Sequence, residues 1–319
     1  MVGAGFAASL LVPQQTSAQD AVTIDPAIPA YKAVSGISGN LNSIGSDTLN
    51  NLMTLWAEGF KKMYPNINIQ IEGKGSSTAP PALIEGTAQL GPMSRPMRGS
   101  EIDSFEAKYG YKPTALRTSL DSLAVFVHKD NPVKGLTLAQ VDGMFSKTFR
   151  CKGGEVKTWG QVGLDGSWSG SPLSLYGRNS ASGTYGFFKE HALCNGDYKD
   201  TVKEQPGSAS VVQGVSEDRN GAGYSGIGYS TSGVRAVPLA PKQGDAFAPA
   251  TYENAIAGKY PLSRALLLYI NRAPGSALDP LVKEFVKFIL SKEGQETVVK
   301  DGYYPLTATI VREELAKLE

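Results

Sequence analysis

The sequence is poor in the residue types that most often carry catalysis and metal binding. Its 319 residues include only two histidines and two cysteines, and it has no run of lysine or arginine. The 31 basic residues are balanced by 30 acidic ones, so the net charge of +1 gives no overall field that would gather a polyanion. We therefore expect no nucleic-acid partner. The 36 glycines and 19 prolines are spread along the chain, which excludes a disordered or collagen-like protein.

Motifs of hydrolases and metalloenzymes are missing as well. His128 ends an apolar run and His191 lies in a helical pattern, so we expect both to be structural or exposed. The sequence contains no HExxH, GxxxxGK[ST] or GxSxG motif, and Ser225 misses the spacing of a nucleophile elbow. A serine hydrolase needs a base beside its nucleophile, and none is apparent. The sequence thus predicts a protein that is not an enzyme and that uses neither a metal nor another cofactor.

The beginning of the sequence predicts export. The first nineteen residues carry no charge, and a small, apolar run extends from Val2 to Val12. This pattern resembles the second half of a signal peptide cleaved after Ala18, although the positively charged start is missing. No other segment reaches the roughly 18 apolar residues that a membrane span requires. We expect residues 1–18 to be a signal peptide and the mature chain to be periplasmic.

The two cysteines, Cys151 and Cys194, favour a disulfide because an exported chain with an even number of cysteines usually pairs them. Closing the loop between them would stabilise the fold by up to about 4 kcal/mol. The alternative is a pair of unbridged thiols in the core.

Short β-type runs alternate with helical patterns, which is typical of an α/β fold. Apolar residues between Leu49 and Met63 recur every three or four positions and predict a helix over about 48–64. An alternating strand over 67–71 should follow. A second helix should begin at Ala79, because the two prolines after it are tolerated only in a first helical turn.

Two apolar runs, Leu123–His128 and Ala265–Ile270, read as buried strands that cross between two domains. The simplest path makes one lobe from 38–120 with 264–319 and another from 121–263, after an extended arm over 19–37. Further elements are expected near Val141–Phe145, as a strand at Leu173–Tyr176, as helices from Ser182 and from about Ser208, as a glycine-rich strand with turns over 221–229, and as a terminal helix at Pro280–Leu290.

Three strand-to-helix junctions share glycine and hydroxyl residues, namely Gly45–Thr48, Gly75–Thr78 and Ser180–Thr184. The N–H groups of a first helical turn have no partner within the helix, and the helix dipole adds about half a positive charge there. Arg178 precedes the third junction and can grip an oxyanion bidentately. Together these features predict a site for a small anion. The alternative at each junction is ordinary helix capping.

Asp47 is unusual at such a site because a carboxylate repels an anion unless the ligand carries a proton to donate. Monohydrogen phosphate carries one, whereas sulfate at neutral pH does not. Asp47 therefore predicts a preference for a protonated oxyanion. The alternative is that its carboxylate caps the helix that follows.

The loop motifs resemble the periplasmic phosphate-binding proteins of phosphate-specific ABC transporters (Pst systems), in the form found in pseudomonad-like bacteria. The resemblance extends over the mature chain and rests on these segments: GSDTL from 45, GSSTAPP from 75, GPMSR from 91, GRNSASGTYG from 177, QPGSAS from 205 and KDGY from 300. It implies a two-lobed α/β protein of the type II-like periplasmic class, with phosphate buried between the lobes. The residues that it implies for phosphate binding are Ser46, Asp47, Thr48, Ser76, Ser77, Thr78, Ser94, Arg178, Ser182, Gly183 and Thr184.

The chain departs from the better-known members of this family in two places. Those members carry threonine in the first loop and aspartate in the third, where this chain has Asp47 and Ser94. We expect Asp47 to have taken over the role of proton acceptor. The family's aspartate two residues after its arginine is Ser180 here, so Arg178 is expected to lack its usual acidic neighbour.

The resemblance implies a monomeric transport receptor whose lobes close on inorganic phosphate and whose closed form is recognised by a membrane permease. Hinges are expected near 119–123 and 262–265. Two other functions are kept as alternatives: a phosphate-binding surface protein that serves adhesion or signalling, and a hydrolase of phosphate esters.

Overall fold

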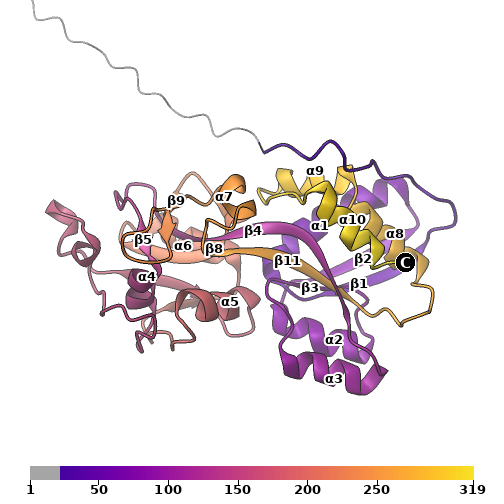
Figure 1. The fold of residues 1–319 in the computed structure, drawn as a ribbon, viewed down its shortest axis with the longest axis horizontal. Helices are drawn as coiled ribbons and strands as arrows, with labels where there is room; N and C mark the ends of the chain where they lie inside the picture. Colours follow the sequence, from indigo (N-terminus) through magenta and orange to yellow (C-terminus); the bar gives the residue numbers. More distant parts are fainter. Residues whose placement is uncertain (1–21) are drawn as a thin grey trace, which may run out of the picture.

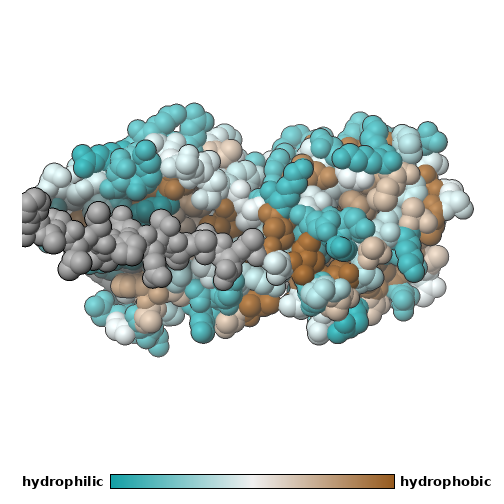
Figure 2. Space-filling view, turned by 90° about the horizontal axis from the view of Figure 1, so that it is seen from above, coloured by the Kyte–Doolittle hydropathy of each residue, from teal (hydrophilic) through white to brown (hydrophobic). Residues whose placement is uncertain are grey.

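The computed structural model describes residues 22–319. The expected signal peptide lies outside the described residues. Within them the chain forms two lobes joined by two long strands (Figure 1). Seen from above, the lobes are separate masses with a narrow waist, and hydrophilic side chains are spread over both (Figure 2). None of the helices in this part of the chain is long and apolar enough to cross a bilayer.

Lobe 1 combines the beginning and the end of the described chain. A parallel pair, β1 with β2, is packed against α1, and the core between them and α8 contains Trp56, Phe60 and Phe285. The arm over 22–37 lies on this lobe, where Ile28 enters the core. The elements of lobe 1 are β1 Gly39–Ile44, α1 Asn50–Met63, β2 Ile67–Glu72, α2 Ala79–Glu85, β3 Gly91–Met93, α3 Gly99–Tyr109, α8 Pro280–Ile289, α9 Lys292–Lys300 and α10 Ala308–Ala316.

Lobe 2 is formed by the middle of the chain around a second core that includes Phe145, Trp159 and Phe188. Its elements are β5 Leu136–Thr137, α4 Leu138–Phe145, β6 Ser174–Arg178, α5 Gly183–Ala192, β7 Lys203–Gln205, α6 Ser208–Glu217, β8 Gly221–Gly226, β9 Val234–Ala236, β10 Leu239–Ala240 and α7 Tyr252–Ile256. The predicted disulfide between Cys151 and Cys194 is present, with the two Cα atoms 5.4 Å apart, so the alternative of unbridged thiols is wrong.

Two antiparallel strands, β4 Thr114–His128 and β11 Ser263–Ile270, run from one lobe into the other (Figure 1). Leu116 on β4 belongs to the core of lobe 1 and Leu123, further along the same strand, to that of lobe 2. They are central in a sheet whose order is β3-β11-β4-β8-β6-β7. The predicted lobe limits at 120/121 and 263/264 fall within these strands and remain a proposal, as do the hinges.

Most of the predicted elements are confirmed. The helix expected over 48–64 begins with a 3₁₀ turn, Asp47–Leu49, and continues as α1, and α2 begins at Ala79 with prolines in its first turn. One prediction is wrong, because the helix from Pro280 is not terminal and α9 and α10 follow it. Helix α3 gave no signal because Phe105 is its only buried residue, so it lacks an apolar stripe.

Candidate functional site

Hydroxyl groups from the predicted junctions meet where the lobes face each other. The Oγ atom of Ser94 lies 3.0 Å from that of Ser46 and 3.3 Å from that of Ser76. From lobe 2, Thr184 Oγ1 lies 3.4 Å from Ser94 Oγ and 2.8 Å from Thr48 Oγ1. All five side chains are buried. The structure thus gathers hydroxyl groups from four separate segments into one cluster.

Parallel strand pairing explains why the two lobe 1 junctions are neighbours. Strands β1 and β2 are parallel, so the loops that follow them leave the same edge of the sheet. The backbone N–H of Gly75 donates to the carbonyl of Gly45 at 2.8 Å, which ties the two loops together. Gly75 has φ +116°, a conformation that favours glycine. The chemistry of both loops is therefore brought to one edge by the strand register.

Lobe 2 approaches this edge closely enough to require glycine. A Cβ atom at Gly183 would lie 2.2 Å from Ser76 Oγ, so a larger residue there would push the lobes apart. A backbone bond also crosses between the lobes, from the N–H of Ser77 to the carbonyl of Ala181 at 3.1 Å. Gly183 therefore acts in this site through its small size.

Ordinary capping accounts for only part of the hydroxyl pattern. Ser182 is the N-cap of α5, and its Oγ accepts from the N–H of Tyr185 at 3.3 Å. Ser46 precedes the 3₁₀ turn without a side-chain capping bond and contacts Ser94 instead. Thr78 donates to the carbonyl of Gly75 at 2.8 Å, and Ser77 Oγ accepts from Arg95 at 3.5 Å. Ser77 and Thr78 make these local bonds rather than joining the hydroxyl cluster.

Asp47 links the two lobes instead of capping its own helix. Its Oδ2 atom accepts from the backbone N–H of Ser208 at 2.8 Å and lies 3.1 Å from Nη1 of Arg178. The alternative that Asp47 is a helix cap is therefore wrong. Arg178 has a serine, Ser180, in place of its usual acidic neighbour, but Asp47 supplies a carboxylate from the opposite lobe.

Arg178, which belongs to lobe 2 and contacts Asp47 of lobe 1, is almost completely buried. Nη1 donates to the hydroxyl of Ser208 at 2.6 Å and Nη2 to the carbonyl of Pro206 at 3.2 Å, while Nε is buried without a partner in the described structure. Burial lowers the pKa of Arg178, and the charge of Asp47 opposes that shift. The site therefore contains a desolvated guanidinium that still has an N–H group to offer.

Two tyrosines hold the backbone beside Asp47. Tyr229 donates its hydroxyl to the carbonyl of Asp47 and Tyr303 donates to that of Thr48, each at 2.9 Å. Burial raises the pKa of both phenols, which keeps them protonated as donors. The backbone that carries the Asp47 side chain is thus held by two phenol hydroxyls.

Sequence reasoning missed three residues of this region: Asp121, Arg264 and Ser208. Arg264 on β11 contacts Asp121 on β4, Thr184 of lobe 2 and the loop of Ser94. A signal was present, since each of these charges interrupts an otherwise apolar or small-residue strand pattern. Ser208 stood within the QPGSAS segment that carried the family resemblance, but it was not assigned to the site.

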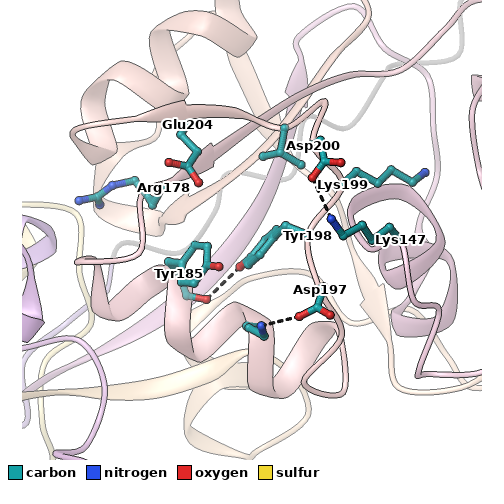
Figure 3. A pocket seen from close by; sticks show the side chains of 10 residues that line it. Lys147, Arg178, Tyr185, Asp197, Tyr198, Lys199, Asp200 and Glu204 are labelled. Carbon is teal, nitrogen blue, oxygen red and sulfur yellow. Dashed lines mark hydrogen bonds and ion pairs between the residues drawn. The ribbon is translucent and has the colours of Figure 1, made fainter.

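A separate cavity of about 600 Å³ lies within lobe 2 (Figure 3). Two of its three lysines are matched by acids, with Lys147 2.9 Å from Asp200 and Lys189 3.0 Å from Asp197, whereas Lys199 donates to the backbone carbonyls of Gly143 and Val156. Arg178 lines one side of the cavity, but Figure 3 shows its guanidinium reaching away from the other labelled side chains. This cavity also lacks the cluster of serine and threonine hydroxyls that gathers at the junction between the lobes.

Similarity to known proteins identifies the family of this chain. Residues 30–293 match the family model of the PBP superfamily domain. The chain is 59% identical to the phosphate-binding protein PstS of Pseudomonas aeruginosa over 95% of this chain and 94% of the relative. The chain therefore belongs to the PBP superfamily, in the family that includes PstS of P. aeruginosa, and the resemblance carried by the loop motifs is confirmed.

Solved structures show the same two-lobed architecture. A putative phosphate ABC transporter substrate-binding protein from Clostridium perfringens, solved with bound phosphate, has a TM-score of 0.70 and 28% identity, and the match covers 84% of this chain and all of that one. An ABC-type phosphate transport receptor from Vibrio cholerae has a TM-score of 0.64 and 23% identity, with 83% and 100% covered, and supports the fold.

Proposed function

We propose that this protein binds inorganic phosphate between its lobes and delivers it to the permease of an ABC transporter. The observation that carries the proposal is that the hydroxyl cluster lies at the junction between the lobes beside Asp47, whose carboxylate contacts the buried Arg178. The named relatives bind phosphate, which supports the choice of ligand. The proposed phosphate-binding residues are those predicted from the sequence, together with Ser208.

The chemistry of the junction suits a small dianion. Serine and threonine hydroxyls donate hydrogen bonds, the turn from Asp47 and helix α5 present N-terminal backbone N–H groups, and Arg178 supplies a positive charge. In a site shielded from water these charge-assisted hydrogen bonds are stronger than in solvent. A small buried ion can thus be held without any excess of basic residues on the surface.

Asp47 is proposed as the acceptor of the proton on the bound phosphate. Both of its bonds in the described structure use Oδ2, which leaves Oδ1 for a ligand hydroxyl. Because a carboxylate only accepts, an unprotonated oxyanion would face it with a lone pair. Asp47 would therefore favour phosphate over sulfate.

The periplasm is the proposed location. The disulfide between Cys151 and Cys194 suits an oxidising compartment, and the sequence begins with the pattern expected of a signal peptide.

Equilibrium dialysis of the purified protein with labelled phosphate tests the proposal. We expect uptake of one phosphate per chain that a large excess of sulfate does not displace. Absence of saturable uptake would contradict phosphate binding, whereas free displacement by sulfate would contradict only the role of Asp47. Turnover of a chromogenic phosphomonoester that is abolished by Ser182→Ala would instead support the hydrolase alternative.

A further inference from the structure

Arg264 reaches the proposed binding loops of both lobes from the strands that join them. Its Nη1 donates to the carbonyl oxygen of Ser94, in lobe 1, at 2.8 Å. Its Nη2 donates to Oγ1 of Thr184, in lobe 2, at 2.9 Å. Because β11 crosses between the lobes, one guanidinium bridges two segments that are far apart in the sequence. This placement gives Arg264 a direct influence on the closed arrangement of both loops.

Asp121 fixes the direction of this guanidinium. Asp121 and Arg264 are paired in the β4–β11 register, and Asp121 Oδ2 accepts from Nε at 2.9 Å and lies 2.8 Å from Nη2. The other carboxylate oxygen accepts from the N–H of Ile227 at 2.9 Å. Both side chains are at least 97% buried, so neither can turn toward water. The arginine is therefore held with its two outer nitrogen atoms aimed at Ser94 and Thr184.

The hydrogen bond from Arg264 to Thr184 determines the direction in which the Thr184 hydroxyl can donate. A guanidinium has donors only, so Oγ1 of Thr184 must accept from Arg264 and keeps its own proton for another partner. Its neighbours are the hydroxyls of Thr48 at 2.8 Å and of Ser94 at 3.4 Å, which are themselves in the proposed anion site. The hydroxyl proton of Thr184 thus points into the cluster rather than toward the strands.

The positive charge of Arg264 also acts on Arg178, the other arginine of the proposed site. Burial is the main cause of the lowered pKa of Arg178, and the charge of Arg264 contributes in the same direction. Asp121 offsets part of the charge of Arg264. The direction of the hydrogen bond from Arg264 to Thr184 does not depend on the net charge of the Asp121–Arg264 pair. The influence of Arg264 on the ligand therefore passes mainly through Thr184.

We propose that Arg264, oriented by Asp121, is a positioning residue for oxyanion binding that makes the Thr184 hydroxyl a donor to the ligand. The proposal rests on the proposed phosphate function and deepens it. It differs from the role expected of Arg178, because Arg264 acts through a second side chain.

A double-mutant cycle measures this indirect action. The variants are Arg264→Lys, Thr184→Val and the two combined, titrated calorimetrically with inorganic phosphate after their folding has been checked by circular dichroism. Lysine keeps the charge beside Asp121 but cannot reproduce the fork of donors. We expect Arg264→Lys to weaken phosphate binding about tenfold in the native background and less than about threefold when Thr184 is valine.

The matched control is Arg117→Lys, which alters an arginine of β4 that pairs with Glu313 and Glu314 outside the site. This control should leave phosphate binding unchanged. An equal loss from Arg264→Lys in both backgrounds would overturn the proposal. If the native protein itself failed to take up phosphate, the proposed function would fail. That result differs from an equal loss in both backgrounds, which would overturn only the role of Arg264.

A second pair of variants leaves the buried ion pair intact. Thr184→Ser keeps the hydroxyl that Arg264 orients and should bind phosphate within about threefold of the native protein, whereas Thr184→Val should lose at least about tenfold. Native affinity in Thr184→Val would overturn the proposal even if Arg264→Lys did not fold.

Discussion

Two aspartate–arginine pairs lie at the junction of the lobes, and they differ in where their members come from. Asp47 and Arg178 belong to opposite lobes and approach to 3.1 Å, with 22% of the Asp47 side chain exposed. Asp121 and Arg264 are neighbours on the paired strands β4 and β11, approach to 2.8 Å, and are almost fully buried. One pair requires the lobes to be together, whereas the other is built into the connection between them.

The Asp47–Arg178 pair is conditional because it forms only when the lobes are together, whereas the Asp121–Arg264 pair is permanent. Asp47 uses one oxygen for both of its described bonds, so a ligand can rearrange its contacts without leaving the carboxylate bare. Both oxygens of Asp121 are engaged, one by Arg264 and one by the N–H of Ile227. We infer that the first pair serves ligand binding and the second holds the geometry of the junction.

Stability should therefore depend far more on the second pair. Asp121→Asn leaves the Arg264 guanidinium buried without its counter-charge and should lower the free energy of unfolding by about 3–5 kcal/mol. Asp47→Asn also removes the counter-charge of a buried guanidinium, but Asp47 is partly exposed and Arg178 keeps its bonds to Ser208 and Pro206, so the loss should be smaller, about 1–2 kcal/mol in ligand-free protein. Chemical denaturation of both variants without phosphate measures the difference. Equal losses would contradict the division between permanent and conditional pairs.

Affinity should depend most on the first pair. Arg178→Met removes the charged donor from a site that excludes water and should weaken phosphate binding by about 30-fold to 100-fold, measured by titration calorimetry. Arg219→Met is the matched control, because Arg219 is an exposed arginine of lobe 2 that lies over Trp168. The control should bind as the native protein does. A loss below threefold for Arg178→Met would place the ligand elsewhere.

Selectivity should depend on the Asp47 carboxylate itself. Asp47→Asn keeps the shape of the side chain but adds N–H donors, so it should accept an unprotonated oxyanion. We expect phosphate binding to weaken about tenfold and sulfate to become a competitor, as measured by displacement of labelled phosphate. Asp103→Asn, an exposed change on α3, controls for the loss of one negative charge. If Asp47→Asn still excluded sulfate, another group would have to accept the phosphate proton.

The sequence predicted the binding loops well because their signals are local. Glycine and hydroxyl residues at a strand-to-helix junction reveal a helix start, the apolar spacing within α1 reveals that helix, and the prolines of α2 mark where α2 begins. The family resemblance then assigned the loops to one cleft. Ser46, Ser76, Ser94 and Thr184 do meet, as that assignment requires.

The two ion pairs could not be derived in the same way because they join distant parts of the chain. Asp47 and Arg178 are 131 positions apart in the sequence, and Arg264 meets Asp121 only because β11 pairs with β4 in a specific register. A single sequence gives no information on strand register at that distance. Ser180 beside Arg178 suggested a missing acid, and only the packing of the lobes revealed its replacement.

A third carboxylate at the junction, that of Asp301, is bonded to an amide rather than to an arginine. Asp301 follows α9 in lobe 1, accepts from the side chain of Asn51, and has its backbone carbonyl close to Gly228 of lobe 2. Burial raises the pKa of Asp301 to about 6, and the bond from Asn51 only partly offsets this effect. Because the effect of burial outweighs the bond from Asn51, the charged form of this group is disfavoured in the folded protein.

The sign of the resulting pH dependence is opposite to that of a salt-bridged acid. Asp301 binds its proton more tightly in the folded than in the unfolded chain, so its contribution to stability is full below about pH 4 and is lost as the pH rises through about 6. Asp301→Asn should therefore match the native protein near pH 4 and exceed its free energy of unfolding by about 1 kcal/mol at pH 7, after allowance for partial solvent screening. Denaturation at both pH values, with Asp103→Asn as the control, measures the effect. A difference that does not change with pH would show that Asp301 is already stabilised as a carboxylate.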